Sequence, residues 1–287
     1  MTNIIVIVGQ TATGKTKLAL ELAKKHNGEL INFDSRQIYK YLDIITGKDI
    51  PKNKIWLYDI VTPDQYFSSF DFVKLATPII EDISKRGKTP ILVGGTYLYL
   101  KHLLYGIDNN NNPPDFKLRA ELDDKTVQEL QQILKTVSLQ SFNRLNHSDV
   151  NNPRRLIRKI EIALTDSTDL TDSERLYLIP ADFIRFHPTI IGLRYKDKNK
   201  LREVITKRVE NRLKTGAIEE VKKLFKMGYD ENDPGLKTIG YQQIIKYLNK
   251  KFTKEKTIED WINKEVQYAK RQLTFMKKDE NISWRDI

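Results

Sequence analysis

Three short motifs hold the residue types that could do chemistry in this 287-residue chain. The first is Gly9–Thr16, which follows the apolar run Ile4–Val8 and matches the phosphate-loop pattern G-x-x-x-x-G-K-[ST]. Its glycines allow the backbone to curl so that successive N–H groups point at one anion, and the following helix adds its N-terminal dipole. Lys15 supplies a positive charge, and the Thr16 hydroxyl can bind Mg²⁺. We therefore predict a di- or triphosphate site made of Gly9, Gln10, Thr11, Ala12, Thr13, Gly14, Lys15 and Thr16.

The second and third motifs follow expected strands. Asp34–Tyr39 comes after the second strand, and Gly94-Gly95-Thr96 comes after the fourth. Ligands of doubly wound sheets bind beyond the carboxyl ends of the strands, so both motifs should line one crevice with the phosphate loop. Asp34 could act as a general base or orient Mg²⁺, but an aspartate at this place can equally cap a helix. The two glycines permit close approach of a ligand, and Thr96 can cap the next helix while offering its hydroxyl.

Basic side chains gather outside these motifs. Arg154 and Arg158 share one face of an expected helix with Arg155 beside them, which suits either a phosphate-rich partner or a solvated surface. Lys270–Phe275 sets an aromatic residue beside two charges, and Lys237–Gln242 places a tyrosine and an amide at a glycine turn, as in surfaces that stack on unpaired bases. The net charge is +11, and the last third of the chain holds 24 Lys and Arg against 15 Asp and Glu. Such a surface attracts polyanions, although a generally Lys-rich composition produces the same excess.

The elements that position these motifs alternate between strand and helix over the first hundred residues, which indicates a parallel sheet flanked by helices. The expected strands are Ile4–Val8, Leu30–Asp34, Trp56–Ile60 and Pro90–Val93, and the expected helices are Thr16–Lys25, Phe70–Lys85 and Thr96–Leu104. A last strand is expected within Phe183–Leu193, and the remainder reads as helical at Lys198–Met227, Tyr241–Leu248 and Thr257–Lys278. We predict an α/β fold, a P-loop NTPase-like parallel sheet with a small helical insertion and a helical C-terminal region.

The insertion is delimited by a change in composition. The polar stretch Gly106–Pro114 breaks any helix and should act as a hinge. Residues 115–146 have helical periodicity but are too few for a domain with its own core, so we expect a helical lid. Pro153 then opens a basic helix over Arg154–Leu164. The predicted organisation is a catalytic core of residues 1–110 and 150–287 with a small insertion at 111–149.

Composition narrows the class of protein. The chain has no cysteine, which excludes disulfides and thiolate metal sites. No apolar stretch reaches the roughly 20 residues of a membrane span, and the N-terminus lacks the zones of a signal peptide. We expect a cytoplasmic protein, acting as a monomer, without a membrane partner.

Taken together, these motifs resemble those of the tRNA dimethylallyltransferase family, also called tRNA isopentenylpyrophosphate transferases. The resemblance spans nearly the whole chain in the family's order, through Gly9–Thr16, Asp34–Tyr39, Ile91–Leu100, Arg154–Arg158 and Lys270–Phe275, with Ile239-Gly240-Tyr241 between the last two. The phosphate loop is generic, whereas the strings Asp-Ser-x-Gln-Ile-Tyr and Val-Gly-Gly-Thr-x-Leu-Tyr are specific to the family.

The resemblance implies a reaction and a set of roles. A dimethylallyl group would pass from dimethylallyl diphosphate to N6 of adenosine 37 in the anticodon stem-loop of tRNA, with Mg²⁺ as the one cofactor. Asp34 would be the general base, Thr96 would help to bind the diphosphate or position the adenine, and Lys15 would serve the leaving group. The donor's diphosphate would lie on the phosphate loop and Arg208, with Thr16 as the metal ligand. Contacts to tRNA would come from Asp34, Ser35, Arg36, Gln37, Thr96, Arg119, Arg154, Arg155, Arg158, Lys237, Gly240, Tyr241, Lys270 and Arg271.

Several positions depart from the family's pattern. The paired arginines of the helix near residue 200 align with Val204 and Arg208, so one positive charge near the diphosphate is missing. Further departures are Asn152 in place of an aspartate, Glu265-Val266 in place of Thr-Arg, Phe275 in place of tryptophan and Ile55-Trp56 in place of paired histidines. They suggest a divergent member whose tRNA preference or efficiency could differ.

Three alternatives remain open on the sequence. An adenylate isopentenyltransferase acting on free AMP, ADP or ATP would share the chemistry, although a mononucleotide needs no basic surface. A P-loop kinase or nucleotide-binding protein would share the loop, although no acidic strand of the Walker B type follows it. A degenerate relative could bind tRNA without catalysis. The cognate tRNAs and the preferred prenyl donor are not specified by any motif.

Overall fold

The computed structural model describes residues 2–48, 55–106, 114–165 and 186–287. They form two compact units, one made of Met1–Ile107 with Asp182–Ile287 and one made of Asp108–Ala181. The larger unit contains the sheet and all three motifs, and we call it the catalytic unit. The described residues do not include 107–113 of the expected hinge or 183–185, which begin the segment expected to hold the last strand.

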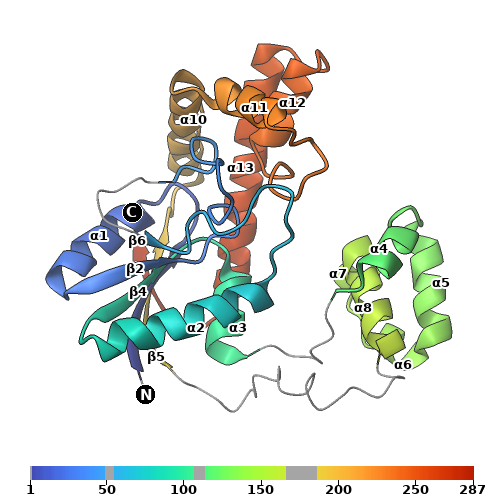
Figure 1. The fold of residues 1–287 in the computed structure, drawn as a ribbon, viewed down its shortest axis with the longest axis horizontal. Helices are drawn as coiled ribbons and strands as arrows, with labels where there is room; N and C mark the ends of the chain where they lie inside the picture. Colours follow the sequence, from blue (N-terminus) through green and yellow to red (C-terminus); the bar gives the residue numbers. More distant parts are fainter. Residues whose placement is uncertain (1, 49–54, 107–113, 166–185) are drawn as a thin grey trace. The chain divides into compact units, whose positions relative to one another are not determined.

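The catalytic unit is built on a parallel sheet of six strands (Figure 1). Their order is β3-β2-β4-β1-β5-β6, with bounds Ile55–Trp56, Gly28–Asn32, Thr89–Val93, Thr2–Gly9, Phe186–Arg194 and Ile282–Asp286. The inner strands are apolar on both faces, as expected where helices cover both sides of a parallel sheet. Ile5 and Ile7 of β1 pack with α1, so the alternate residues Val6 and Val8 face the other layer.

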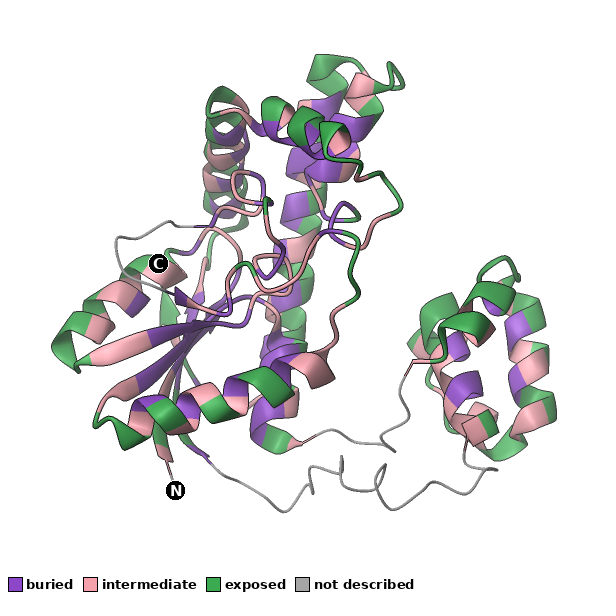
Figure 2. Cartoon of the chain, in the orientation of Figure 1, coloured by how far each residue is buried: buried purple, intermediate pink, exposed green. Residues whose placement is uncertain are grey.

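Helices flank this sheet and extend beyond it (Figures 1 and 2). The N-terminal half contributes α1 (Lys15–Lys25), α2 (Ser69–Lys85) and α3 (Tyr97–Tyr105). The C-terminal part contributes α10 (Lys198–Lys214), α11 (Ala217–Lys226), α12 (Tyr241–Leu248) and α13 (Lys254–Met276). Helix α2 begins with a capping box in which Ser68 and Asp71 bond each other's backbone, as the pattern Ser-x-x-Asp allows.

A second apolar core joins the C-terminal helices to the loop after β2. Trp261 and Tyr241 are fully buried there against Ile38, Leu42 and Ile45. This packing matters for the site because the loop that it holds, residues 43–48, lies next to the phosphate loop in the cavity described below.

The described residues of the smaller unit, 114–165, form a cluster of helices, α4 (Phe116–Asp123), α5 (Val127–Val137), α6 (Leu139–Asn143), α7 (His147–Val150) and α8 (Pro153–Thr165). Leu130, Leu134, Leu156 and Ile160 are fully buried in its own core. The expectation that the insertion lacks a core is therefore wrong, and so is the boundary at 149/150. The reason is that the apolar face of α8, assigned above to the catalytic core, packs against α5 and supplies half of that core.

The remaining expectations mostly hold. The strand and helix predictions are confirmed to within a few residues, with two exceptions. Strand β3 is only Ile55–Trp56, and the expected helical segment Lys198–Met227 is divided into α10 and α11 at Gly216, whose φ is 108°. Strand β6 was not predicted, because Ile282–Asp286 has little apolar character beyond its contact with β5. Among the helices within the described ranges, none has the length and apolarity needed to cross a bilayer.

Candidate active site

The phosphate loop has the backbone geometry that its glycines predict. Gly9 has a φ of 146°, and a Cβ there would lie 2.2 Å from the carbonyl oxygen of Leu193 on β5. Gly14 has a φ of 78° and stands at the N-cap of α1 without a side-chain cap. Since the first N–H groups of a helix have no intrahelical acceptor, the start of α1 presents donors and a positive dipole end to an anion.

Not all of the loop is available to a ligand. The N–H of Gln10 donates to Leu193 O at 3.3 Å, and the N–H of Thr11 donates to Gln272 Oε1 at 2.9 Å. The Gln10 side chain is buried, donating to Ala269 O and accepting from the N–H of Tyr195. The predicted donor-binding role of Gln10 therefore fails for both its N–H and its side chain, because both are bonded to other parts of the protein. The anion site narrows to Ala12–Thr16, with Lys15 Nζ donating to Gln10 O at 2.7 Å.

Asp34 and Thr96 meet at the carboxyl ends of β2 and β4. One oxygen of Asp34 accepts from the N–H of Arg36 at 3.0 Å, which closes a turn; no helix follows Asp34 in the described segment 2–48, so the helix cap that the sequence allowed is not formed. The hydroxyl of Thr96 accepts from the N–H of Ser35 at 2.9 Å and donates to Ser35 Oγ at 3.1 Å. The second oxygen of Asp34 lies 3.3 Å from where a Cβ on Gly95 would stand. Asp34 is half-buried and lines the cavity, so it can combine its bond within the turn with a catalytic role.

Gln272 of α13 ties these motifs together and was not singled out by the sequence. Its Oε1 accepts from Thr11 N of the phosphate loop, and its Nε2 donates to Gly95 O at 3.0 Å. The sequence signal for a functional role of this helix was the short string Lys270–Phe275, which contains Gln272. The neighbouring Tyr268 also lines the cavity, and burial, with the nearby Asp34 carboxylate, raises the pKa of its phenol. Helix α13 therefore fixes the distance between the anion site and the Asp34–Thr96 pair.

These residues line one cavity of about 1000 Å³. Thr11–Thr16 form one wall, Asp34 and Gly94 another, and Arg208 and Arg212 of α10 a third. Arg208 donates to Thr11 Oγ1 at 3.4 Å, which places this predicted donor-binding residue at the phosphate loop. The loop 43–48 closes the same wall, held by Gln37 Nε2, which donates to Gly47 O at 3.0 Å.

Arg212 is a second arginine at this wall that sequence reasoning missed. Its side chain is 7% exposed and donates to Glu265 Oε1 at 3.0 Å. Burial, with the positive charge of Arg208 beside it, lowers the pKa of Arg212 to about 10. It remains charged at neutral pH.

The other predicted basic residues fall into two groups. Arg119, Arg154, Arg155 and Arg158 all belong to the smaller unit. Arg119 and Arg158 both bond the buried Glu161, at 2.5 Å and 3.0 Å, and Arg155 pairs with Asp149. Arg154 is exposed. These arginines organise a charged surface on α8 and α4 in addition to any contact they make with a partner.

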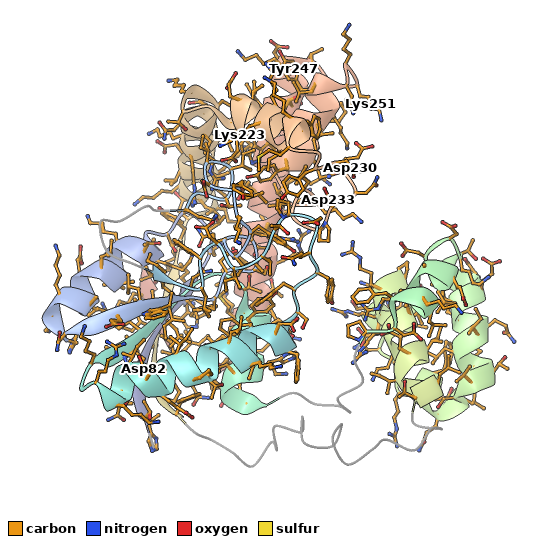
Figure 3. The ribbon with its side chains drawn as sticks, viewed as in Figure 1. Asp82, Lys223, Asp230, Asp233, Tyr247 and Lys251 are labelled. Carbon is orange, nitrogen blue, oxygen red and sulfur yellow. The ribbon has the colours of Figure 1, made fainter. Side chains whose placement is uncertain are left out.

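The second group lies on the catalytic unit. Lys237, Lys270 and Arg271 are exposed, as are Lys223 and Lys251 around α11 and α12 (Figure 3). Gly240 and Tyr241, expected to contact tRNA, do not belong with them. Tyr241 is fully buried and donates its hydroxyl to Glu220 at 2.5 Å, and a Cβ at Gly240 would meet Ile45 and Trp261. The expected contact is wrong because both residues are packed in the second core.

Most departures from the family pattern have a structural account. Asn152 still caps α8, accepting from Arg155 N at 3.3 Å. Phe275 packs edge-on against Tyr97 at 5.3 Å, Val266 lies in the second core, and Trp56 donates to Glu29. Val204 lines the cavity where a charge was expected.

The residues fit a Mg²⁺ ion only in company with a phosphate. Among the described residues, no group of three or more His, Cys, Asp or Glu side chains is placed to hold a metal. The Thr16 hydroxyl at the start of α1 suits an ion whose other ligands are phosphate oxygens and water, the set that Mg²⁺ prefers.

Comparison with known proteins decides the family. A model of the family described as IPP transferase matches residues 37–279. The tRNA dimethylallyltransferase of Acetivibrio thermocellus is 37% identical over 293 residues, covering 99% of this chain and 91% of that protein. This chain belongs to the IPP transferase family. A second relative from the family, the tRNA dimethylallyltransferase of Clostridioides difficile, is 36% identical over 298 residues, covering 99% of this chain and 91% of its own length.

Solved structures of IPP transferases share the fold. The full-length tRNA isopentenylpyrophosphate transferase of Bacillus halodurans has a TM-score of 0.71 at 33% identity, covering all of this chain and 90% of that one. A eukaryotic dimethylallyltransferase studied acting on tRNA has a TM-score of 0.80 at 26% identity, covering all of this chain and 74% of that one. They confirm the predicted P-loop-like α/β fold, and these relatives do not favour the mononucleotide or kinase alternatives.

Proposed function

We propose that this chain transfers the dimethylallyl group of dimethylallyl diphosphate to N6 of adenosine 37 in tRNA. The observation that carries the proposal is that Asp34 and the phosphate loop line one cavity, and that Gln272 bonds the loop to Gly95, beside which Asp34 lies. A diphosphate on one wall and an amine beside the carboxylate would meet within that cavity. The names of the relatives support tRNA as the acceptor.

The reaction needs few groups. The N6 lone pair attacks C1 of the donor, the C1–O bond breaks, and the electron pair leaves with the diphosphate. One N6 proton passes to the Asp34 carboxylate, since delocalisation into the purine makes the amine weak until it is deprotonated. Lys15 and Arg208 stand where they can neutralise the charge that develops on the diphosphate. A Mg²⁺ ion held by Thr16 and the donor phosphates would add to that neutralisation.

Thr96 has a positioning role and does not take part in the bond changes. Its hydroxyl already bonds both the N–H and the hydroxyl of Ser35, so it holds the Asp34 turn against the end of β4. We further propose that the protein acts as a monomer. Light scattering of the purified protein tests that state.

The proposal is tested by incubating the protein with Mg²⁺, dimethylallyl diphosphate and a tRNA containing an A36-A37-A38 run. Mass analysis should find N6-(dimethylallyl)adenosine at position 37. Asp34→Asn should lower turnover by about 10²–10⁴-fold while leaving tRNA affinity within about twofold, the usual range for a general base. Lys15→Ala should instead weaken binding of the donor. Unchanged turnover in Asp34→Asn would show that Asp34 is not the general base. Prenylation of free AMP in preference to tRNA would show that the acceptor is a mononucleotide.

A further inference from the structure

Arg212 and Glu265 form a buried ion pair at the wall of the site that their own packing does not explain. Both are polar side chains in the second apolar core, with 7% and 11% of their surface exposed. Removing two charges from water costs several kcal/mol per ion, and such pairs often stabilise a protein less than apolar residues of the same size would. The simplest explanation for such a buried ion pair is that it serves binding or catalysis and not the stability of the fold.

The guanidinium of Arg212 has donors left over. It has five N–H groups, and within the described part of the chain its one hydrogen bond goes to Glu265 Oε1. That same oxygen also accepts from Trp261 Nε1 at 3.4 Å. A nine-tenths buried guanidinium with free donors beside a polar cavity is suited to binding an anion.

Arg208 and Arg212 converge on one point. A Cβ on Gly47 would lie 2.5 Å from an NH2 of Arg208 and 2.7 Å from an NH2 of Arg212. Two like charges side by side repel, and Glu265 balances one of them. The pair of arginines thus keeps one net positive charge beside Thr11, where Arg208 already bonds the phosphate loop.

We propose that Arg212, held by Glu265, is the second guanidinium that binds the donor's diphosphate, taking over the charge absent at Val204. Residues 204, 208 and 212 are spaced four apart on α10 and all line the cavity, so a charge moved from 204 to 212 stays on the face of the helix that meets the donor. Because the charge of Arg212 is buried, it requires the opposite charge of Glu265 beside it. This inference rests on the proposed function, since it assigns a diphosphate to that cavity.

The test measures binding of inorganic pyrophosphate with Mg²⁺ by calorimetry, in the absence of tRNA. Arg212→Met should raise the Kd for pyrophosphate by roughly 10- to 100-fold, the range of charge-assisted hydrogen bonds. Arg202→Met removes the same charge from an exposed position of α10 and should change the Kd by less than about threefold, the effect expected of a screened charge.

A double variant separates binding from folding. Arg212→Met alone leaves Glu265 buried without a charged partner, so the double variant Arg212→Met/Glu265→Gln is used to remove both charges while keeping side chains of similar volume. If Arg212 only supports Glu265, this double variant binds pyrophosphate as the natural protein does, which would overturn the proposal. If Arg212 binds the diphosphate, the double variant stays weak, and adding Val204→Arg restores the Kd to within a few fold.

Kinetics provide a second readout. The double variant should raise the KM for dimethylallyl diphosphate and leave the KM for tRNA unchanged. Natural protein that is folded but binds no pyrophosphate would contradict the proposed function itself. Tight binding by both the natural protein and the double variant would contradict only the role of Arg212.

Discussion

Glu220 offers the sharpest test of how the C-terminal helices support the site. Its buried carboxylate on α11 accepts from the N–H groups of Asp43, Ile44 and Ile45 at 3.0, 2.7 and 3.2 Å, and from the Tyr241 hydroxyl at 2.5 Å. One side chain thereby holds the loop 43–48 that closes the wall of the cavity.

Glu220→Gln conserves the shape of the side chain, and the hydrogen bonds that it changes can be counted. The new NH2 group is best accommodated where Oε1 stands, because the hydroxyl of Tyr241 can rotate to accept from it. The N–H of Ile45 cannot rotate and is left buried without an acceptor, which costs about 1–3 kcal/mol. The bonds to Asp43 and Ile44 also lose the assistance of a charge, so we expect a total loss of about 2–4 kcal/mol.

Urea unfolding followed by circular dichroism measures this loss. Glu219→Gln is the matched control, since Glu219 is the exposed neighbour on the same helix and should change stability by less than about 0.5 kcal/mol. The KM for the donor should rise in Glu220→Gln, because Asp43 and Ile44 line the cavity. Equal unfolding midpoints for the two variants, with unchanged slopes, would refute the reasoning that Glu220 anchors the loop.

Three further predictions concern the rest of the site and the sheet. Gln272→Ala removes the link between Thr11 N and Gly95 O and should lower kcat at least tenfold, because it loosens the alignment of the reacting groups. Steady-state kinetics measure this loss, with Leu273→Ala as the control. Equal losses of kcat in the two variants would contradict the role of Gln272. Gly9→Ala should abolish folding or donor binding, because its Cβ would lie 2.2 Å from Leu193 O, and soluble protein with normal donor binding would disprove the clash. Bonds to Arg86, Lys88 and Trp56 hold the pKa of Glu29 below its usual value of 4.5, against the opposing effect of burial. The stability that the ionised Glu29 adds is complete above pH 4.5 and is lost progressively as the pH falls from there through the lower pKa of the folded state. Glu29→Gln should therefore lower the unfolding midpoint most at pH 7 and by progressively less as the pH falls below 4.5. A difference in midpoint that does not change with pH would contradict the assignment.

Much of the site could be predicted because its chemistry is local. Gly9 and Gly14 mark a backbone curl, Lys15 and Thr16 follow at fixed spacing, and Asp34 and Thr96 stand directly after strands. Each of these signals depends on a few neighbouring residues, and the parallel sheet then brings the ends of its strands to one edge. Strand and helix positions were predicted for the same reason, since periodicity is a property of short segments.

What the sequence by itself determined is therefore the phosphate loop, the strand-end motifs and the α/β fold that brings them together. The tertiary structure alone decided which long-range partners complete them. Gln272 bonds Thr11, which is 261 residues away in the sequence, and Glu220 bonds Asp43, which is 177 residues away. Tyr241, expected at the surface, is a core residue. The physical reason is that a buried hydrogen bond or ion pair needs two partners in space, and neither residue alone signals the position of the other.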